Sequence, residues 1–258
     1  MAMPRVRRLA SVAVVASLAV AGLSACRSEP SVAAYVGAGR ISEARVQQVW
    51  DQAYDAVNAQ RAAGAAPAEA ASPDAAGDTQ AVAMPITRGD VVRALISADV
   101  LGRVARQQNV TLPADLRLSD YANRVRVPAD TDYVRLYAEA DALVSLLRAE
   151  AQGAPEPTNA DLREVYDVLA ADQLAGGATF EDFKAQLPEQ NRQLVRSAVA
   201  VRNEINEVAG SLRIRVNPRY RPLDIAILNY QTQNGELRPL LVAPLGANDA
   251  TAPVSSAG

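Results

Sequence analysis

The sequence predicts a mainly α-helical protein, with a small β element that joins the two ends of its folded part. Apolar residues recur at steps of three and four over most of residues 43–210, which is the period of an amphipathic helix. The stretches 33–36 and 212–216 instead have the extended or alternating pattern of strands. These two patterns predict the fold class.

The first 25 residues are typical of an export signal and are therefore left out of the fold. Arg5, Arg7 and Arg8 precede an uncharged run over 9–22, which is shorter than the roughly 20 apolar residues of a spanning helix. Leu23-Ser24-Ala25-Cys26 follows directly and matches the bacterial lipobox. We expect a lipoprotein signal peptide over 1–25 and a diacylglycerol thioether on Cys26.

Two other interpretations of this segment remain open: an uncleaved signal anchor, and an ordinary signal peptide cut after Ala25 that leaves a free thiol. The lipoprotein is favoured because Cys26 is the only cysteine, so no intramolecular disulfide competes for it. Two acyl chains anchor a protein stably, since each buried CH₂ contributes roughly 0.8 kcal/mol. This predicts an exported protein at the outer face of the cell membrane, with a lipidated tether over 26–32. Palmitate incorporation should depend on Cys26.

Composition limits the classes of function. The net charge of −3 provides no basic field for a nucleic-acid backbone. The chain has no histidine, which excludes Ser-His-Asp and Cys-His nucleophiles and removes the commonest metal ligand. No phosphate-binding glycine loop or oxygen-rich metal loop occurs. We therefore expect no catalytic residue, no metal and no cofactor, although catalysis by carboxylates alone stays open.

Helix boundaries follow from capping residues and from the apolar period. Ser42 is expected to cap the first helix, and Gly210 to end the last one. The wide apolar stripe of the second helix predicts a central position. The expected helices are 43–61, 88–108, 117–126, 131–151, one from 158 or 159 through Leu169, a short one from Thr179, and 189–210.

Two segments are expected to be disordered. Residues 62–86 consist largely of Ala, Gly, Pro, Ser and Asp, and such a segment buries too little apolar surface to offset its ordering entropy. A further strand is expected over 224–228, followed by a largely disordered tail over 229–258. The predicted helical domain therefore covers 33–228, with 62–86 as an insertion.

The two strand-like stretches are predicted to pair with each other. An isolated hairpin is marginally stable, so the segment 33–36 gains most by pairing with 212–216. This pairing brings both ends of the domain together. We also expect it to pack the last helix on the first.

Three motifs resemble SurA/PrsA-type envelope chaperones. The stretch from Ala34 to Ser42 resembles their opening strand, turn and helix cap, with Gly37 where Asn is usual. The stretch 157–166 resembles the helix that precedes their isomerase module. Val216-Asn217-Pro218-Arg219-Tyr220 resembles the element after the last helix in lipoproteins with a SurA N-terminal domain. The resemblance covers most of 33–225 and implies a helical chaperone domain whose terminal segments pack together.

The same resemblance implies the absence of isomerase activity. Full-length relatives carry a parvulin domain of roughly 90 residues, whereas only about a dozen residues separate Tyr166 from Phe180 in this chain. Parvulin catalysis also relies on paired histidines, which are missing. We therefore expect a SurA N-terminal-like module that is not an enzyme.

Several residues are candidates for binding. Trp50 and Tyr54 lie one helical turn apart and could line a peptide groove, because aromatic side chains give a large contact area, although core packing is the favoured interpretation. The same two interpretations apply to Tyr133 and Tyr137. The acidic pairs Asp130/Asp132 and Glu181-Asp182 lie at helix starts, which favours capping over catalysis. Residues 217–220 are expected to form a turn held by Tyr220, with a partner contact as the alternative.

The leading functional hypothesis is a lipid-anchored, non-catalytic chaperone or holdase for unfolded exported polypeptides. It would bind apolar segments in a cradle between the first and last helices. The alternative is an envelope assembly or interaction protein that binds one folded partner.

Overall fold

The computed structural model describes residues 31–64, 83–172 and 176–246. The predicted signal peptide, Cys26 and most of the 26–32 tether lie outside these residues. The greater part of the predicted 62–86 insertion also lies outside them. Within the described ranges, no helix is both long and apolar enough to span a membrane.

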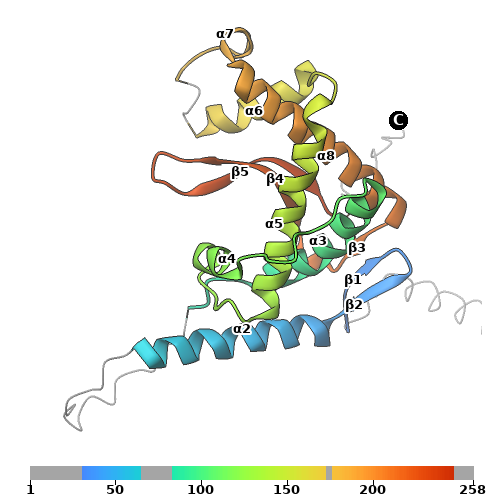
Figure 1. Ribbon diagram of the computed structural model, residues 1–258, viewed down its shortest axis with the longest axis vertical. Helices are drawn as coiled ribbons and strands as arrows, with labels where there is room; N and C mark the ends of the chain where they lie inside the picture. The colour runs from blue at the N-terminus through green and yellow to red at the C-terminus, as the bar shows by residue number, and fades with distance from the viewer. Residues whose placement is uncertain (1–30, 65–82, 173–175, 247–258) are drawn as a thin grey trace, which may run out of the picture.

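The protein is mainly helical, with two small antiparallel sheets (Figure 1). The predicted helices are confirmed, most to within about two residues. The first helix runs to Gly64 and so enters the expected insertion, and at the other end of that insertion Ile86 is buried in the core. The helices are α2 (Glu43–Gly64), α3 (Arg88–Gln107), α4 (Leu118–Val125), α5 (Asp132–Glu150), α6 (Asn159–Ala171), α7 (Phe180–Gln186) and α8 (Glu189–Leu212), with short 3₁₀ turns η2 (Ala151–Gly153) and η3 (Pro218–Tyr220).

The helix starts follow the capping residues seen in the sequence. Thr87, Thr158 and Thr179 each form a capping box with the Asp three residues later, which satisfies two otherwise unpaired backbone N–H groups. Ser42 accepts a hydrogen bond from the N–H of Arg45 at 3.2 Å. The expectation that Gly210 ends the last helix is wrong, because α8 continues to Leu212 and Arg213 adopts the left-handed cap conformation.

The predicted pairing of 33–36 with 212–216 is confirmed at Arg215 and Val216, whereas Leu212 belongs to α8 and Arg213 caps that helix. Strands β1 (Val32–Val36), β2 (Gly39–Ser42) and β3 (Arg215–Val216) form a sheet in the order β2-β1-β3, with antiparallel neighbours. The N–H of Asn217 donates to the carbonyl of Ala33 at 2.9 Å and continues this pairing beyond β3. Gly37 has a φ of +60°, which allows the tight turn between β1 and β2.

A second sheet corrects the expected disordered tail over 229–258. Strand β4 (Asp224–Gln231) extends the predicted 224–228 strand, and β5 (Leu237–Pro244) pairs with it as an antiparallel hairpin. Residues 229–246 are therefore ordered, and 247–258 lie outside the described part of the chain. Apolar side chains of both strands are buried, and this burial explains why the segment is ordered.

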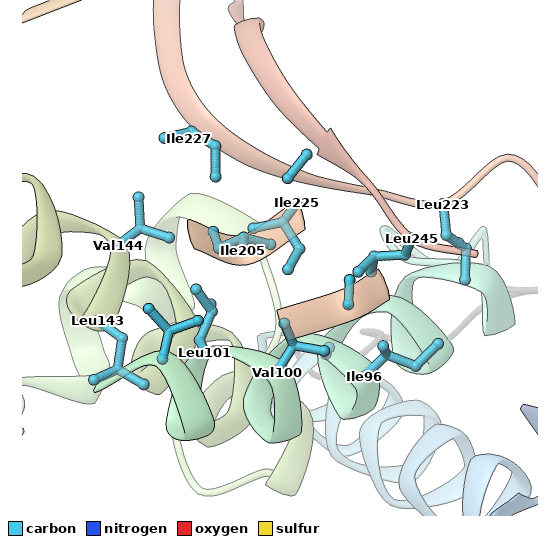
Figure 2. Close-up of a cluster of buried hydrophobic side chains, with 14 of the residues drawn as sticks. Ile96, Val100, Leu101, Leu143, Val144, Ile205, Leu223, Ile225, Ile227 and Leu245 are labelled. Atoms are coloured by element: carbon cyan, nitrogen blue, oxygen red, sulfur yellow. The ribbon is translucent and has the colours of Figure 1, made fainter. Parts of the chain in front are cut away.

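Helix α3 lies at the centre of the fold, as its wide apolar stripe predicted. It contacts α2, α5, α8, β1 and β4. The expected packing of the last helix on the first is not the main one, because α8 packs on α3, α5 and the hairpin, while α2 packs on α3 and α5. Figure 2 shows Ile225 and Ile227 of β4 beside Val144 of α5, Leu101 of α3 and Ile205 of α8.

Candidate functional site: a groove between two helices and a hairpin

An open cavity of about 460 Å³ lies between α3, α5 and the β4–β5 hairpin. We call it the tyrosine groove. Its volume falls in the range of ligand sites, and its lining combines apolar and polar side chains, as such sites do. The lining residues are Asp90, Arg93, Ala94, Ser97, Leu101, Tyr133, Tyr137, Ala140, Asp141, Val144, Asp224, Ile225, Ala226, Asn229, Leu237, Pro239 and Val242.

The hairpin supplies one wall of the groove because its two faces differ. Ile227 and Leu241 are at most 2% exposed and belong to the core. Pro239 and Val242 of β5 line the groove, and both can do so although they are three positions apart because the strand pairing is irregular between Leu241 and Pro239. At the distal end Leu237 is 56% exposed, the most exposed large hydrophobic residue in the part of the chain that the structure describes. The hairpin therefore buries one face and offers an apolar face to a ligand.

Asp172, the C-cap residue of α6, holds the distal part of the hairpin. The Tyr230 hydroxyl donates a hydrogen bond to its carboxylate, and Arg238 Nη1 lies 3.2 Å from both carboxylate oxygens. Tyr230 and Arg238 are cross-strand partners, so a single carboxylate engages both strands. The hydrogen bond to Asp172 also raises the pKa of Tyr230. This contact fixes the position of the hairpin wall.

Helix α5 supplies the aromatic wall. Tyr133 and Tyr137 are one turn apart and stack with their ring centroids 6.4 Å apart, and Tyr121 of α4 meets Tyr137 edge to face at 6.3 Å. Burial raises the pKa of Tyr133 and of Tyr137, so both hydroxyls stay protonated at neutral pH. Stacked tyrosines present rigid apolar surface with a hydroxyl that can donate a hydrogen bond.

Three carboxylates line the groove, and they are not equally neutralised. Asp90 pairs with Arg93 at 2.7 Å, and Asp141 pairs with Arg124 at 3.0 Å. Asp224 makes no ion pair with another described residue. The groove thus keeps one carboxylate available for a positively charged group of a ligand.

The residues proposed first from the sequence lie elsewhere. Trp50 is half-buried against the core, with the Arg88 guanidinium 5.0 Å from its ring centroid, and Tyr54 is 38% exposed. Both lie on α2 and neither lines the tyrosine groove. Of the aromatic candidates, Tyr133 and Tyr137 are the two that the structure brings together at a cavity.

The other candidates have structural contacts. Asp182 completes a capping box with Thr179, whose hydrogen bonds lower the pKa of Asp182. Asp132 pairs with Arg45 at 3.2 Å, whereas Asp130 is exposed. These contacts agree with capping and surface roles.

The turn at 217–220 is held as expected. The Tyr220 hydroxyl donates to Glu43 Oε2 at 2.6 Å, and Arg219 forms an ion pair with the same carboxylate. Glu43 is the first residue of α2, so these contacts tie the segment after β3 to the start of the first helix.

Within residues 31–64, 83–172 and 176–246, no group of three or more His, Cys, Asp or Glu side chains is placed to hold a metal ion. Comparisons with protein families, with curated proteins and with solved structures give no match. The tyrosine groove is therefore the candidate site on its geometry alone.

Proposed function

We propose that this chain is a lipid-anchored, non-catalytic polypeptide-binding module of the chaperone or holdase type, acting at the outer face of the cell membrane. The observation that carries the proposal is the tyrosine groove, whose two walls are an aromatic helix face and an apolar hairpin face. Its location differs from the predicted cradle between the first and last helices.

The lining indicates what the groove binds. Ala226, Pro239, Val242 and Leu237 offer small and branched apolar contacts along the hairpin, which suit an extended segment lying beside a strand. The tyrosine hydroxyls and the Asn229 amide can hydrogen-bond to the backbone of such a segment. Asp224 favours a segment that carries a Lys or Arg. The preferred ligand is therefore an unfolded, mainly apolar segment with a basic residue.

The sequence supports the anchor and the module independently of the groove. The lipobox ending in Cys26 favours lipid attachment, and the motifs at 34–42, 157–166 and 216–220 resemble those of SurA/PrsA-type chaperones. The missing isomerase segment and the missing histidines favour binding without catalysis. On this proposal the lipid places a binding module where newly exported chains emerge.

An aggregation assay with an unfolded client tests the module. The mature protein should suppress aggregation at near-stoichiometric ratios, and Leu237→Gln should weaken the suppression several-fold, because it removes apolar contact from the rim of the groove. Leu194→Gln is the matched control, since Leu194 is 41% exposed on α8 outside the groove. Equal activity of both variants and wild type would exclude the groove as the binding site.

Cross-linking in membranes separates the holdase from an assembly protein. Many substoichiometric partners, lost together in Leu237→Gln, support the holdase. One dominant stoichiometric partner would contradict it and favour binding to a single folded envelope protein. Palmitate labelling of wild type and Cys26→Ala tests the anchor separately.

A further inference from the structure

Two arginines lie on the outer face of the β2-β1-β3 sheet, and a third is exposed beside it, at the C-cap of α8. Arg40 of β2 and Arg215 of β3 are both cross-strand partners of Tyr35 in β1, which places the three side chains on one face. Both arginines are exposed, and the Arg215 guanidinium lies 5.0 Å from the Tyr35 ring centroid. Arg213, two residues before Arg215, is exposed as well.

Within the described part of the chain, these three arginines are not neutralised. None of them forms an ion pair with another described residue, and β1, β2 and β3 contain no acidic residue. The nearest acidic side chain on the following helix, Glu43, is already engaged by Arg219 and Tyr220. We call Arg40, Arg213 and Arg215 the sheet arginines.

The sheet beside the sheet arginines begins close in sequence to the proposed lipid anchor. Ser31, the first described residue, follows Cys26 by only five residues, which span at most about 18 Å when fully extended. This step rests on the proposed lipid on Cys26. A lipidated Cys26 therefore holds β1 close to the membrane surface, within reach of its head groups.

We propose that the sheet arginines dock this face on anionic phospholipid head groups. Guanidinium groups match phosphate oxygens in a bidentate geometry, and an unpaired basic cluster complements a negatively charged surface. Docking fixes an orientation that the lipid on Cys26 does not specify. The β1–β2 end then faces the membrane, and the tip of the β4–β5 hairpin, at the opposite side of the body in Figure 1, faces away from it.

Energy transfer on vesicles measures this orientation in the lipidated mature protein. A donor dye on Ala38→Cys marks the exposed turn between β1 and β2, and a dye on Asn234→Cys marks the hairpin tip. Each variant has one free thiol, because Cys26 carries the lipid. Vesicles of phosphatidylcholine, with or without phosphatidylglycerol, contain an acceptor-labelled lipid.

On phosphatidylglycerol vesicles, transfer from position 38 should exceed transfer from position 234, and the difference should shrink on pure phosphatidylcholine. Each arginine near an anionic surface changes the equilibrium about fivefold. The triple variant Arg40→Gln, Arg213→Gln, Arg215→Gln should thus lower the ratio of docked to undocked protein roughly 100-fold. High salt should act in the same direction.

The control is Arg117→Gln, Arg126→Gln, Arg163→Gln, which makes the same charge change at exposed positions on or beside α4 and α6. It should keep the wild-type orientation. Equal transfer on both vesicle types, or equal loss in both triple variants, would overturn the proposal. If the patch binds an acidic protein instead of lipid, energy transfer will not depend on phosphatidylglycerol, and the proposal fails. Protein that leaves the vesicles altogether would instead disprove the anchor.

Discussion

The two sheets of this protein are both small and antiparallel, but they are held in different ways. The β2-β1-β3 sheet joins residues about 180 positions apart in the sequence, and Glu43 secures it through Tyr220 and Arg219. The β4–β5 hairpin pairs locally, buries one face in the core and leaves the other open to the tyrosine groove. The first sheet therefore closes the fold, whereas the second forms a wall of the candidate site.

The largest effect is expected inside the hairpin. Leu241→Ala should lower the free energy of unfolding by about 2–5 kcal/mol, because Leu241 is fully buried and its truncation leaves a cavity. Leu237→Ala, on the same strand but 56% exposed, should change it by no more than about 0.5 kcal/mol. Urea unfolding followed by circular dichroism measures both. Similar losses for the two variants would show that the hairpin has no inner and outer face.

A smaller effect is expected at the closure of the first sheet. Tyr220→Phe removes the hydroxyl that donates to Glu43 and should cost about 1–2 kcal/mol, since hydrogen bonds to a charged group are stronger than neutral ones. Tyr54→Phe on α2 serves as the control and should leave stability unchanged to within about 0.5 kcal/mol. Chemical unfolding reports both values. No difference between the two variants would mean that Tyr220 does not secure the closure.

Both regions contain a tyrosine whose pKa burial raises, Tyr133 beside the groove and Tyr220 beside the first sheet. A raised folded-state pKa means that the folded protein keeps its proton where the unfolded chain releases it, near pH 10. Their contribution to stability is therefore complete below about pH 10 and is lost as the pH rises through the folded-state pKa. Tyr133→Phe should flatten this alkaline loss more than Tyr220→Phe, because Tyr133 is more deeply buried. Unfolding curves between pH 9 and 11 provide the measurement, and a steeper loss in Tyr133→Phe would contradict the assignment.

The smallest change in global stability is expected at the hairpin tip. Asp172→Asn weakens the contacts with Tyr230 and Arg238, both on the outer part of the hairpin, so amide exchange over residues 229–238 should accelerate while the global Tm changes little. Glu236→Gln, whose carboxylate is 3.5 Å from Arg238 and exposed, is the control. Unchanged exchange in Asp172→Asn would show that packing alone fixes the groove wall.

The most predictable parts of the fold are those that depend on residues close together in the sequence. The helix period and the threonine caps predict most helix bounds to within about two residues. The pairing of β1 with β3 was also predictable, because a lone hairpin at residues 33–41 needs a third strand. The hairpin was missed because Pro239 and Pro244 interrupt β5 and suggest a coil. Asn234-Gly235 between two apolar runs was the signal that could have revealed it.

The groove was not predictable, because its helix walls and its strand wall come from residues 80 or more positions apart in the sequence. Tyr133 and Tyr137 carry the same pattern as any buried pair on a helix, and only the placement of the hairpin opposite them turns them into a site. Trp50 and Tyr54 carry an equivalent aromatic pattern in the sequence, but neither lines the groove in the structure.

The pairing of β1 with β3 also affects whether the module can be inserted into another protein. Gly246 at the end of the described chain lies against Val216, next to the strand that pairs with β1, so the chain enters and leaves the body at neighbouring points. Adjacent ends allow a domain to be inserted into a host protein or circularly permuted without distortion. The body between 31 and 246 could thus be spliced into a surface loop of a carrier and retain its groove.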